Sequence, residues 1–513
     1  MTIPKPELRL DDLRFAAKRL QHDYAASVPH AVERVKQHPP RADLSMLKRA
    51  DFLHIIAQEN SFASWPQLKH AAQTIGLDRA TKVQRLKLAL YHGQNALVSA
   101  LLRDTPDLAD GHFGLQVALY DVDAVRRALA DDPKRATTPM GPRRPILHLA
   151  FSKWFQAWPD LKPAMLDIAE MLVAYGADVN DSFPHQPGSD HRLSALYGAI
   201  GHANNMALGQ WFLDHGADPN DGESLYHATE LGHHDGLRML LTAGAEPTGT
   251  NALLRAMDFH DHKAVEMLLE HGAQADDFNA DEVGGETPWV VPALHQAARR
   301  GSDERMVDLL LQAGADPARI YKGASAYGYA KVHGNQAVIN AIEARGGETP
   351  LSREETLMAR AATGQDSPGE FINPALLPEA YADLVREILH LPGRLDQVQR
   401  LIALGLPWDK PDAEGLTPVQ IAGWEGLPEV MEYFLRMKPD LSHVNGYGGT
   451  LLSTILHGSE NNPDREGRDY LTCLELALRE GVALPRSAIS QTGREDLRAF
   501  LEDWGEAHPG QLV

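Results

Sequence analysis

Apolar and polar residues follow a helical periodicity along most of the chain, in short segments that often end at a glycine. One phrase recurs: an apolar helix face is followed by Gly-Ala-Asp or a close variant, and then often by Pro or Val. Clear copies occupy 171–181, 211–221, 239–249, 267–277 and 309–319. Weaker copies occupy 341–350, 401–412 and 476–486. Such self-similarity predicts a stack of repeated units, because a single helix pair leaves an apolar face that only a neighbour can cover.

The glycine of each clear copy marks the expected end of a helix. A left-handed residue commonly follows a helix, and glycine adopts that conformation without the cost that a Cβ atom imposes. The predicted helix ends are Gly176, Gly216, Gly244, Gly272 and Gly314.

A shorter helix is predicted before each of these glycine-ended helices. Its clearest forms are PILHLAF at 145–151, PALHQAA at 292–298 and LTPVQIAG at 416–423. Thr417 suits a helix start because its hydroxyl can cap free amides, and Pro418 has its φ preset for the first turn. His295 is expected to hydrogen-bond to backbone between neighbouring repeats. The chain is therefore predicted to be built from helical hairpins.

The paired phrases resemble the ankyrin repeat, which has a period of about 33 residues and a T-P-L-H-x-A core. The resemblance covers residues 81–490. It implies an all-α fold, an ankyrin-repeat solenoid of about ten to eleven helix-turn-helix repeats with an N-terminal helical cap. The spacing is uneven, and the insertions at 151–164, 182–191 and 277–292 are expected to form loops at the rim of a binding face.

The uneven spacing also predicts the domain organisation. We expect an N-terminal helical cap at 1–80, a first sub-array of repeats at 81–350, a second at 383–490 and a C-terminal cap at 491–513. Residues 351–382 are interpreted as a degenerate repeat or linker, and both a real bend and a plain insertion are compatible with them.

Two further segments resemble a group of bacterial ankyrin-repeat proteins. NSFASWPQLKHA at 60–71 is similar to a FASWPxLK-type helical segment that heads those proteins. The stretch at 447–462 is similar to the group in part, since Leu451 replaces the usual proline and Ile455 the usual alanine. This resemblance implies the fold and a bacterial source, but no mechanism.

Charge narrows the range of partners. The chain has 70 acidic and 49 basic residues, and its formal net charge is −21. An acidic surface repels phosphate backbones and anionic lipid, so we expect neither nucleic acid nor membrane as a partner. Cys473 is the single cysteine, which excludes an internal disulfide and a thiolate metal cluster. The N-terminus has no apolar segment of the kind that directs secretion, and we expect a cytoplasmic protein.

Catalytic and cofactor motifs are absent from the sequence. There is no HExxH, Walker A, GxSxG or CxxC motif, so we predict no cofactor, no metal and no catalytic residue. His227 and Glu230 lie three residues apart and share a helix face, which could hold a metal if Asp258 joined them. Two ligands do not make a metal site, and local pairing of His227 with Glu230 is the favoured interpretation.

The concave groove of the array is the predicted binding surface. In an ankyrin repeat, the residue after the histidine of the TPLH motif and those before the following glycine point into the groove. This register gives the predicted ligand or partner residues: His227, Glu230, Arg255, Asp258, Arg299, Arg300, Tyr329, Trp424, Glu425 and His457. Aromatic residues and arginines dominate binding energetics, which supports a role in recognition.

Three functions fit this sequence. The first is a binding scaffold that recognises a protein or peptide through its concave groove, where a small molecule is a further candidate ligand. The second is an enzyme whose pocket is built across the groove from His, carboxylate and Arg side chains. The third is an acidic regulatory or immunity-like protein that masks a basic partner. A deep closed pocket would favour the enzyme, and an open groove the scaffold.

Overall fold

The computed structural model describes residues 10–41, 44, 47–60, 62, 65, 68, 77–186, 188–281, 290–412, 414–462 and 465–513. The chain divides into two compact units. The first comprises Met1–Ala252 and Asn279–Thr287, and the second comprises Leu253–Phe278 and Pro288–Val513.

The first unit begins with a cluster of three helices. They are α1 (Leu10–Ala25), α2 (Pro29–Gln37) and α3 (Arg49–Glu59). Leu20, Phe52 and Ile55 are buried at the centre of this cluster, whose core contains no residue from the repeats. Helices are therefore confirmed at the N-terminus. The predicted resemblance at 60–71 lies almost wholly outside the described residues.

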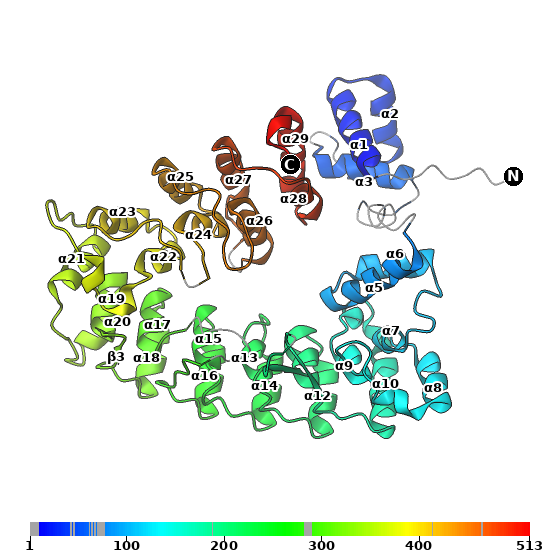
Figure 1. Cartoon of the computed structure of the whole chain (residues 1–513), viewed down its shortest axis with the longest axis horizontal. Coiled ribbons are helices and arrows are strands. Elements are labelled where there is room, and N and C mark those ends of the chain that lie inside the picture. Colours follow the sequence, from blue (N-terminus) through cyan, green and yellow to red (C-terminus); the bar gives the residue numbers. More distant parts are fainter. Residues whose placement is uncertain are drawn as a thin grey trace. The chain divides into compact units, whose positions relative to one another are not determined.

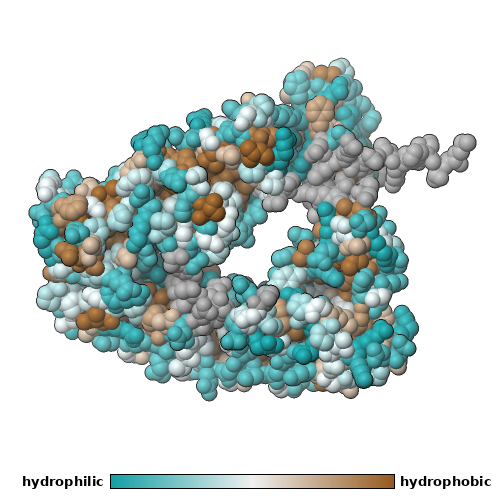
Figure 2. Space-filling model, viewed as in Figure 1, coloured by the Kyte–Doolittle hydropathy of each residue, from teal (hydrophilic) through white to brown (hydrophobic). Residues whose placement is uncertain are grey.

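Helical hairpins follow in the first unit. Their helices are α5 (Arg79–His92), α6 (Asn95–Asp104), α7 (Phe113–Ala118), α8 (Val122–Asp131), α9 (Pro145–Ala150), α10 (Lys162–Ala174), α11 (Ala195–Tyr197), α12 (Met206–Asp214), α13 (Ser224–Ala228) and α14 (Asp235–Thr242). Short helical turns η1 (Pro133–Ala136), η2 (Trp154–Gln156) and η3 (Pro159–Leu161) connect some of them, and the π-helix η4 (Gly198–His202) continues α11. Figure 2 shows hydrophilic residues over the outward ends of α12 and α14, as expected where apolar faces are buried between hairpins.

The second unit continues the same arrangement. Its hairpin helices are α15 (Ala252–Asp258), α16 (His262–Glu270), α17 (Ala293–Arg299), α18 (Glu304–Gln312), α19 (Ala326–His333), α20 (Gln336–Glu343), α22 (Leu384–Leu389), α23 (Leu395–Ala403), α24 (Pro418–Trp424), α25 (Pro428–Arg436), α26 (Leu451–Asn461) and α27 (Tyr470–Arg479). Beyond α27 lie α28 (Arg486–Gln491), α29 (Glu495–Ala507) and the turn η7 (Pro509–Gln511).

Within this unit the first helices of successive hairpins lie side by side, and so do the second helices (Figure 1). Helix α17 packs against α19 and α24 against α26, whereas α18 packs against α20 and α25 against α27. We call α15, α17, α19, α22, α24 and α26 the first-helix row. Ala297 and Ala298 of α17 are fully buried, because small side chains let neighbouring first helices approach closely.

The turns within and after the hairpins follow the sequence signals. All five glycines predicted to end helices have positive φ, and Gly314 at 96° is typical. At their other end, the second helices begin at capping side chains, such as Asp303 before α18 and Asn335 before α20. Each such cap contributes about 1 kcal/mol by satisfying amides that have no partner inside the helix.

One of the predicted loops contains more structure than expected. Residues 182–191 were predicted to be an irregular loop, but β1 (Ser182–Pro184) pairs with β2 (Arg192–Ser194) in an antiparallel ribbon. A second ribbon joins β3 (Ile320–Tyr321) to β4 (Ala324–Ser325). The backbone pairing of a repeat finger is not visible in the alternation of a segment this short.

Residues 351–382, predicted to be a degenerate repeat or linker, include a helix. Helix α21 (Arg353–Ala362) packs against α19 and α23, and the turns η5 (Pro374–Leu376) and η6 (Glu379–Tyr381) follow it. Ser352 and Glu355 form a capping box at its start. The division into sub-arrays at this segment stays a prediction. Across the described ranges, no helix is long and apolar enough to cross a membrane.

Candidate functional site in the first-helix row

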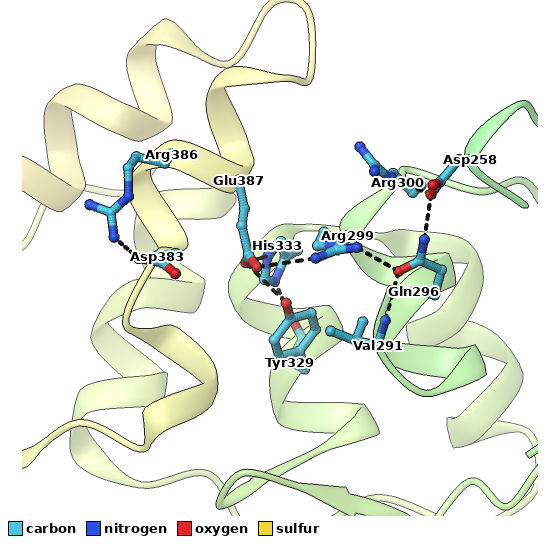
Figure 3. A network of polar contacts seen from close by, with 10 residues as sticks. All are labelled: Asp258, Val291, Gln296, Arg299, Arg300, Tyr329, His333, Asp383, Arg386 and Glu387. Carbon is cyan, nitrogen blue, oxygen red and sulfur yellow. Dashed lines mark hydrogen bonds and ion pairs between the residues drawn. The ribbon is translucent and has the colours of Figure 1, made fainter. Parts of the chain in front are cut away.

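A carboxylate lies at the centre of a polar network in the second unit (Figure 3). Glu387 of α22 accepts a hydrogen bond from the Tyr329 hydroxyl at 3.0 Å and one from Nε2 of His333 at 3.1 Å, both residues of α19. Its other oxygen lies 3.6 Å from Nη1 of Arg299 on α17. Side chains from α17, α19 and α22 therefore converge on the carboxylate of Glu387.

The surroundings of Glu387 hold it in its ionised form. Burial by itself would raise the pKa of this carboxyl, but the hydrogen bond and charge of His333 and the charge of Arg299 outweigh burial and lower the pKa to about 2. Nδ1 of His333 lies 3.0 Å from the Tyr329 carbonyl, so both ring nitrogens face acceptors.

The network extends from Arg299 toward the first helices that precede it. Nη2 of Arg299 donates to the Gln296 side chain at 2.8 Å, and the amide of Gln296 donates to Asp258. Asp258 also accepts from Nε of Arg300 at 2.7 Å and from Nη1 of Arg255 at 3.0 Å. The side-chain amide of Gln296 thus links two ionic clusters (Figure 3).

A third carboxylate lies further along the row. Glu425 follows α24 and is 2.7 Å from Nδ1 of His390 and 3.5 Å from Nη2 of Arg468. Burial acts to raise the pKa of Glu425, but the hydrogen bond from His390 outweighs it and lowers the pKa. Beside it, the rings of Trp424 and His457 lie 5.3 Å apart between centroids.

One arrangement occurs three times in this row. Each of the carboxylates of Asp258, Glu387 and Glu425 lies largely inside the unit and is shared by two basic groups. A buried carboxylate with paired donors fixes the positions of long basic side chains, which otherwise move freely. The arrangement can therefore present cations and aromatic rings in a defined geometry.

The first unit has a separate cluster around His227. Its Nδ1 lies 2.9 Å from Glu230, and its Nε2 lies 3.2 Å from Glu223, which is buried and also lies 2.8 Å from His191. Burial lowers the pKa of His227, but the hydrogen bonds with Glu223 and Glu230 outweigh burial and raise the pKa to about 9. The predicted pairing of His227 with Glu230 is confirmed. Among the described residues, no group of three or more potential ligands is arranged to hold a metal ion.

The predicted site residues of the second unit differ in exposure. Arg255, Arg300 and Trp424 are partly exposed, and His457 is exposed. Tyr329 and Glu425 were predicted to line an open groove, but the structure buries both. The reason is packing between repeats: Tyr329 stacks on His333 and contacts α22, and Glu425 is covered by its two basic partners. Tyr329 and Glu425 therefore pack between helices and position other side chains, and they do not line the groove themselves.

Sequence reasoning missed several members of these clusters. Arg468 and His191 come from irregular segments where the repeat register gives no position, and Glu387 of α22 lies outside the positions that this register assigns to the groove. Glu223 lies four residues before His227 on the same helix, so the i, i+4 spacing was a usable signal that the TPLH register obscured. Glu387 and Arg299 are 88 positions apart in the sequence, and only the fold brings them together.

Comparison with known proteins agrees with the hairpin arrangement. Residues 292–321 match the ankyrin repeat family. This ankyrin repeat contains α17, α18 and the start of the following finger. The predicted all-α ankyrin-repeat fold is thus confirmed as hairpins stacked within each unit.

Two further comparisons were made. The human ASB11 ankyrin repeat domain, known from a crystal structure, has 19% sequence identity to this chain and a TM-score of 0.34. That match covers 47% of this chain and 100% of the ASB11 domain. No curated protein matches the chain.

Proposed function

We propose that the chain is a binding scaffold, and that the first-helix row of its second unit recognises a protein or peptide partner. Ankyrin repeats generally serve as protein-interaction modules. The observation that carries the proposal is that the buried carboxylates of Asp258 and Glu425 hold the partly exposed basic side chains of Arg255, Arg300 and His390 in place. Side chains fixed before binding lose little entropy when a partner arrives.

Residue chemistry also supports recognition. Arginine and tryptophan are enriched among the residues that dominate binding free energy. Arg255, Arg300 and Trp424 are all partly exposed at or near the ends of first helices. A cytoplasmic location and a bacterial source belong to the same proposal.

The enzyme alternative has less support from the geometry. His333 is buried and both of its nitrogens are engaged, so it has no free position from which to take a proton from a substrate. Glu387 accepts two hydrogen bonds and pairs with Arg299, which favours a structural role for its charge.

Affinity capture tests this proposal. Partners are captured from a lysate of the source organism with the wild-type chain and with an Arg300→Ala/Trp424→Ala variant, and are identified by mass spectrometry. We expect the variant to lose specific partners, because truncating one strong contact residue weakens an interface by about 2 kcal/mol or more.

The matched control is Arg305→Ala, which removes a largely exposed arginine from α18 in the second row of helices. It should retain every partner that the wild-type chain captures. Equal loss in the control and in the double variant, or no loss in either, would exclude the first-helix row as the binding surface.

A further inference from the structure

The geometry points to an acidic segment of a partner protein as the occupant of the first-helix row. This inference rests on the proposed function and adds the chemistry of the partner. The evidence for it is which partner of each ion pair is buried and which is exposed. In two of the clusters the exposed fractions of the side chains are 5% and 7% for Asp258 and Glu425, but 25%, 27% and 35% for Arg255, Arg300 and His390. In the central cluster Glu387 is 17% exposed, whereas Arg299 and His333 are 11% and 0% exposed.

A ligand on this surface therefore meets cations first. The carboxylates of Asp258 and Glu425 are buried, and the side chains of Arg255, Arg300 and His390 reach the surface, so the more exposed half of these pairs is the basic half. Helix C-termini favour cations by themselves, but that effect does not require buried carboxylates behind them. Here each carboxylate orients two basic groups, as expected of a site that positions donors for incoming carboxylates.

The balance of charge in this set is opposite to that of the chain. Four arginines of the three clusters (Arg255, Arg299, Arg300 and Arg468) face three carboxylates, which leaves one positive charge before either histidine is counted. A positive surface in a chain of net charge −21 would attract an acidic peptide and repel a basic one.

The three clusters are connected to one another along the row. Gln296 joins Asp258 to Arg299, and Arg299 reaches Glu387. The turn after α17 adjoins the turn after α22, since a Cβ atom built on Gly301 would lie 3.5 Å from Leu391. His390, next to Leu391, reaches Glu425. An extended acidic peptide could therefore contact Arg300 and His390 together.

A peptide fits this surface better than a nucleic acid does. Duplex DNA carries a negative charge about every 1.7 Å along its axis, so a long polyanion would extend past the basic clusters onto an acidic chain. A short peptide can place a few carboxylates on the cations alone. Trp424 and His457 adjoin Glu425 and could receive an apolar or aromatic residue of the same peptide.

Binding of designed peptides tests the inference. The probes are three fluorescein-labelled peptides of about twelve residues, which differ only in carrying Glu, Gln or Lys at the same positions. Fluorescence anisotropy is measured with the full chain. We expect the Glu peptide to bind most tightly, and raising the salt concentration to several times about 0.1 M should weaken it.

Charge variants locate the binding. Arg255→Gln/Arg300→Gln should weaken binding of the Glu peptide on the order of tenfold, whereas Arg305→Gln on α18 should leave it unchanged. Circular dichroism melting checks that both variants fold. As a third arm, a single-stranded oligothymidylate should bind more weakly than the Glu peptide.

Four results would overturn the acidic occupant. These are equal binding of the Glu and Gln peptides, equal weakening by Arg305→Gln, tighter binding of the oligothymidylate, and no binding of the Glu peptide. If the Lys peptide binds instead and Trp424→Ala weakens it, the charge assignment is wrong but the binding surface stands. The proposed function itself fails if the first-row variant and the Arg305→Ala control do not differ in partner capture.

Discussion

At the scale of single residues, buried carboxylates determine where the basic side chains lie. His227 illustrates this in the first unit, where it lies between Glu223 and Glu230. The sequence predicted its pairing with Glu230 because the two residues share a helix face. It could not predict the burial of Glu223 or the approach of His191, because both depend on how neighbouring repeats pack.

The charge on His227 predicts a dependence of stability on pH. The pKa of His227 is raised from 6.5 to about 9 in the folded chain. A raised pKa contributes stability fully below the unfolded value, and this contribution is lost as the pH rises through about 9. We expect His227→Gln to lower the free energy of unfolding by up to about 3 kcal/mol at pH 6, and by much less at pH 10.

Melting midpoints from pH 6 to pH 10, followed by circular dichroism, measure this effect. His112→Gln is the matched control, since His112 is an exposed histidine of the same unit. A difference between wild type and His227→Gln that stays constant across this range would show that the His227 charge does not stabilise the fold.

At the scale of elements, the sequence predicted the helices well and the connections less well. The apolar periodicity and the glycines at helix ends located the hairpins, because these are local properties of the chain. The β1–β2 ribbon was missed as a regular element, and the bounds of helix α21 were not predicted within the segment 351–382. The ribbon is formed by backbone pairing between residues 182–184 and 192–194 and has no pattern of its own. Helix α21 lies in a segment that departs from the repeat phrase.

The close approach of first helices gives a prediction at this scale. A Cβ atom on Gly458 of α26 would lie 2.3 Å from the Trp424 carbonyl oxygen, which belongs to α24 and is backbone. Gly458→Ala should therefore separate α24 from α26 and destabilise the chain by about 1–3 kcal/mol. Gly510→Ala is the control, because a Cβ atom there would meet nothing within 4 Å.

Thermal melting of both variants measures the effect. A lower midpoint for Gly458→Ala, with no change for Gly510→Ala, is the expected result. An unchanged midpoint for Gly458→Ala would show that the row tolerates wider spacing than the structure indicates. Partner binding through Trp424 should then also be insensitive to the substitution.

At the scale of the whole molecule, stacking of the repeats brings residues at equivalent positions of the first helices onto one surface. Four of the predicted site residues of the second unit (Arg255, Arg300, Trp424 and His457) have exposed side-chain area. The buried network of Glu387 was harder to predict, because it joins helices that are distant in sequence. The sequence could predict which residues lie at the ends of first helices, but not which of them packing would bury.

Amide hydrogen exchange with and without a captured partner tests the central claim most directly. If the first-helix row binds the partner, protection should increase in α17, α22, α24 and α26 of the second unit. Exchange in α18, α23, α25 and α27 should stay unchanged, because the second helices would not contact the partner. Protection that increases only in the second helices, or only in the first unit, would contradict the account.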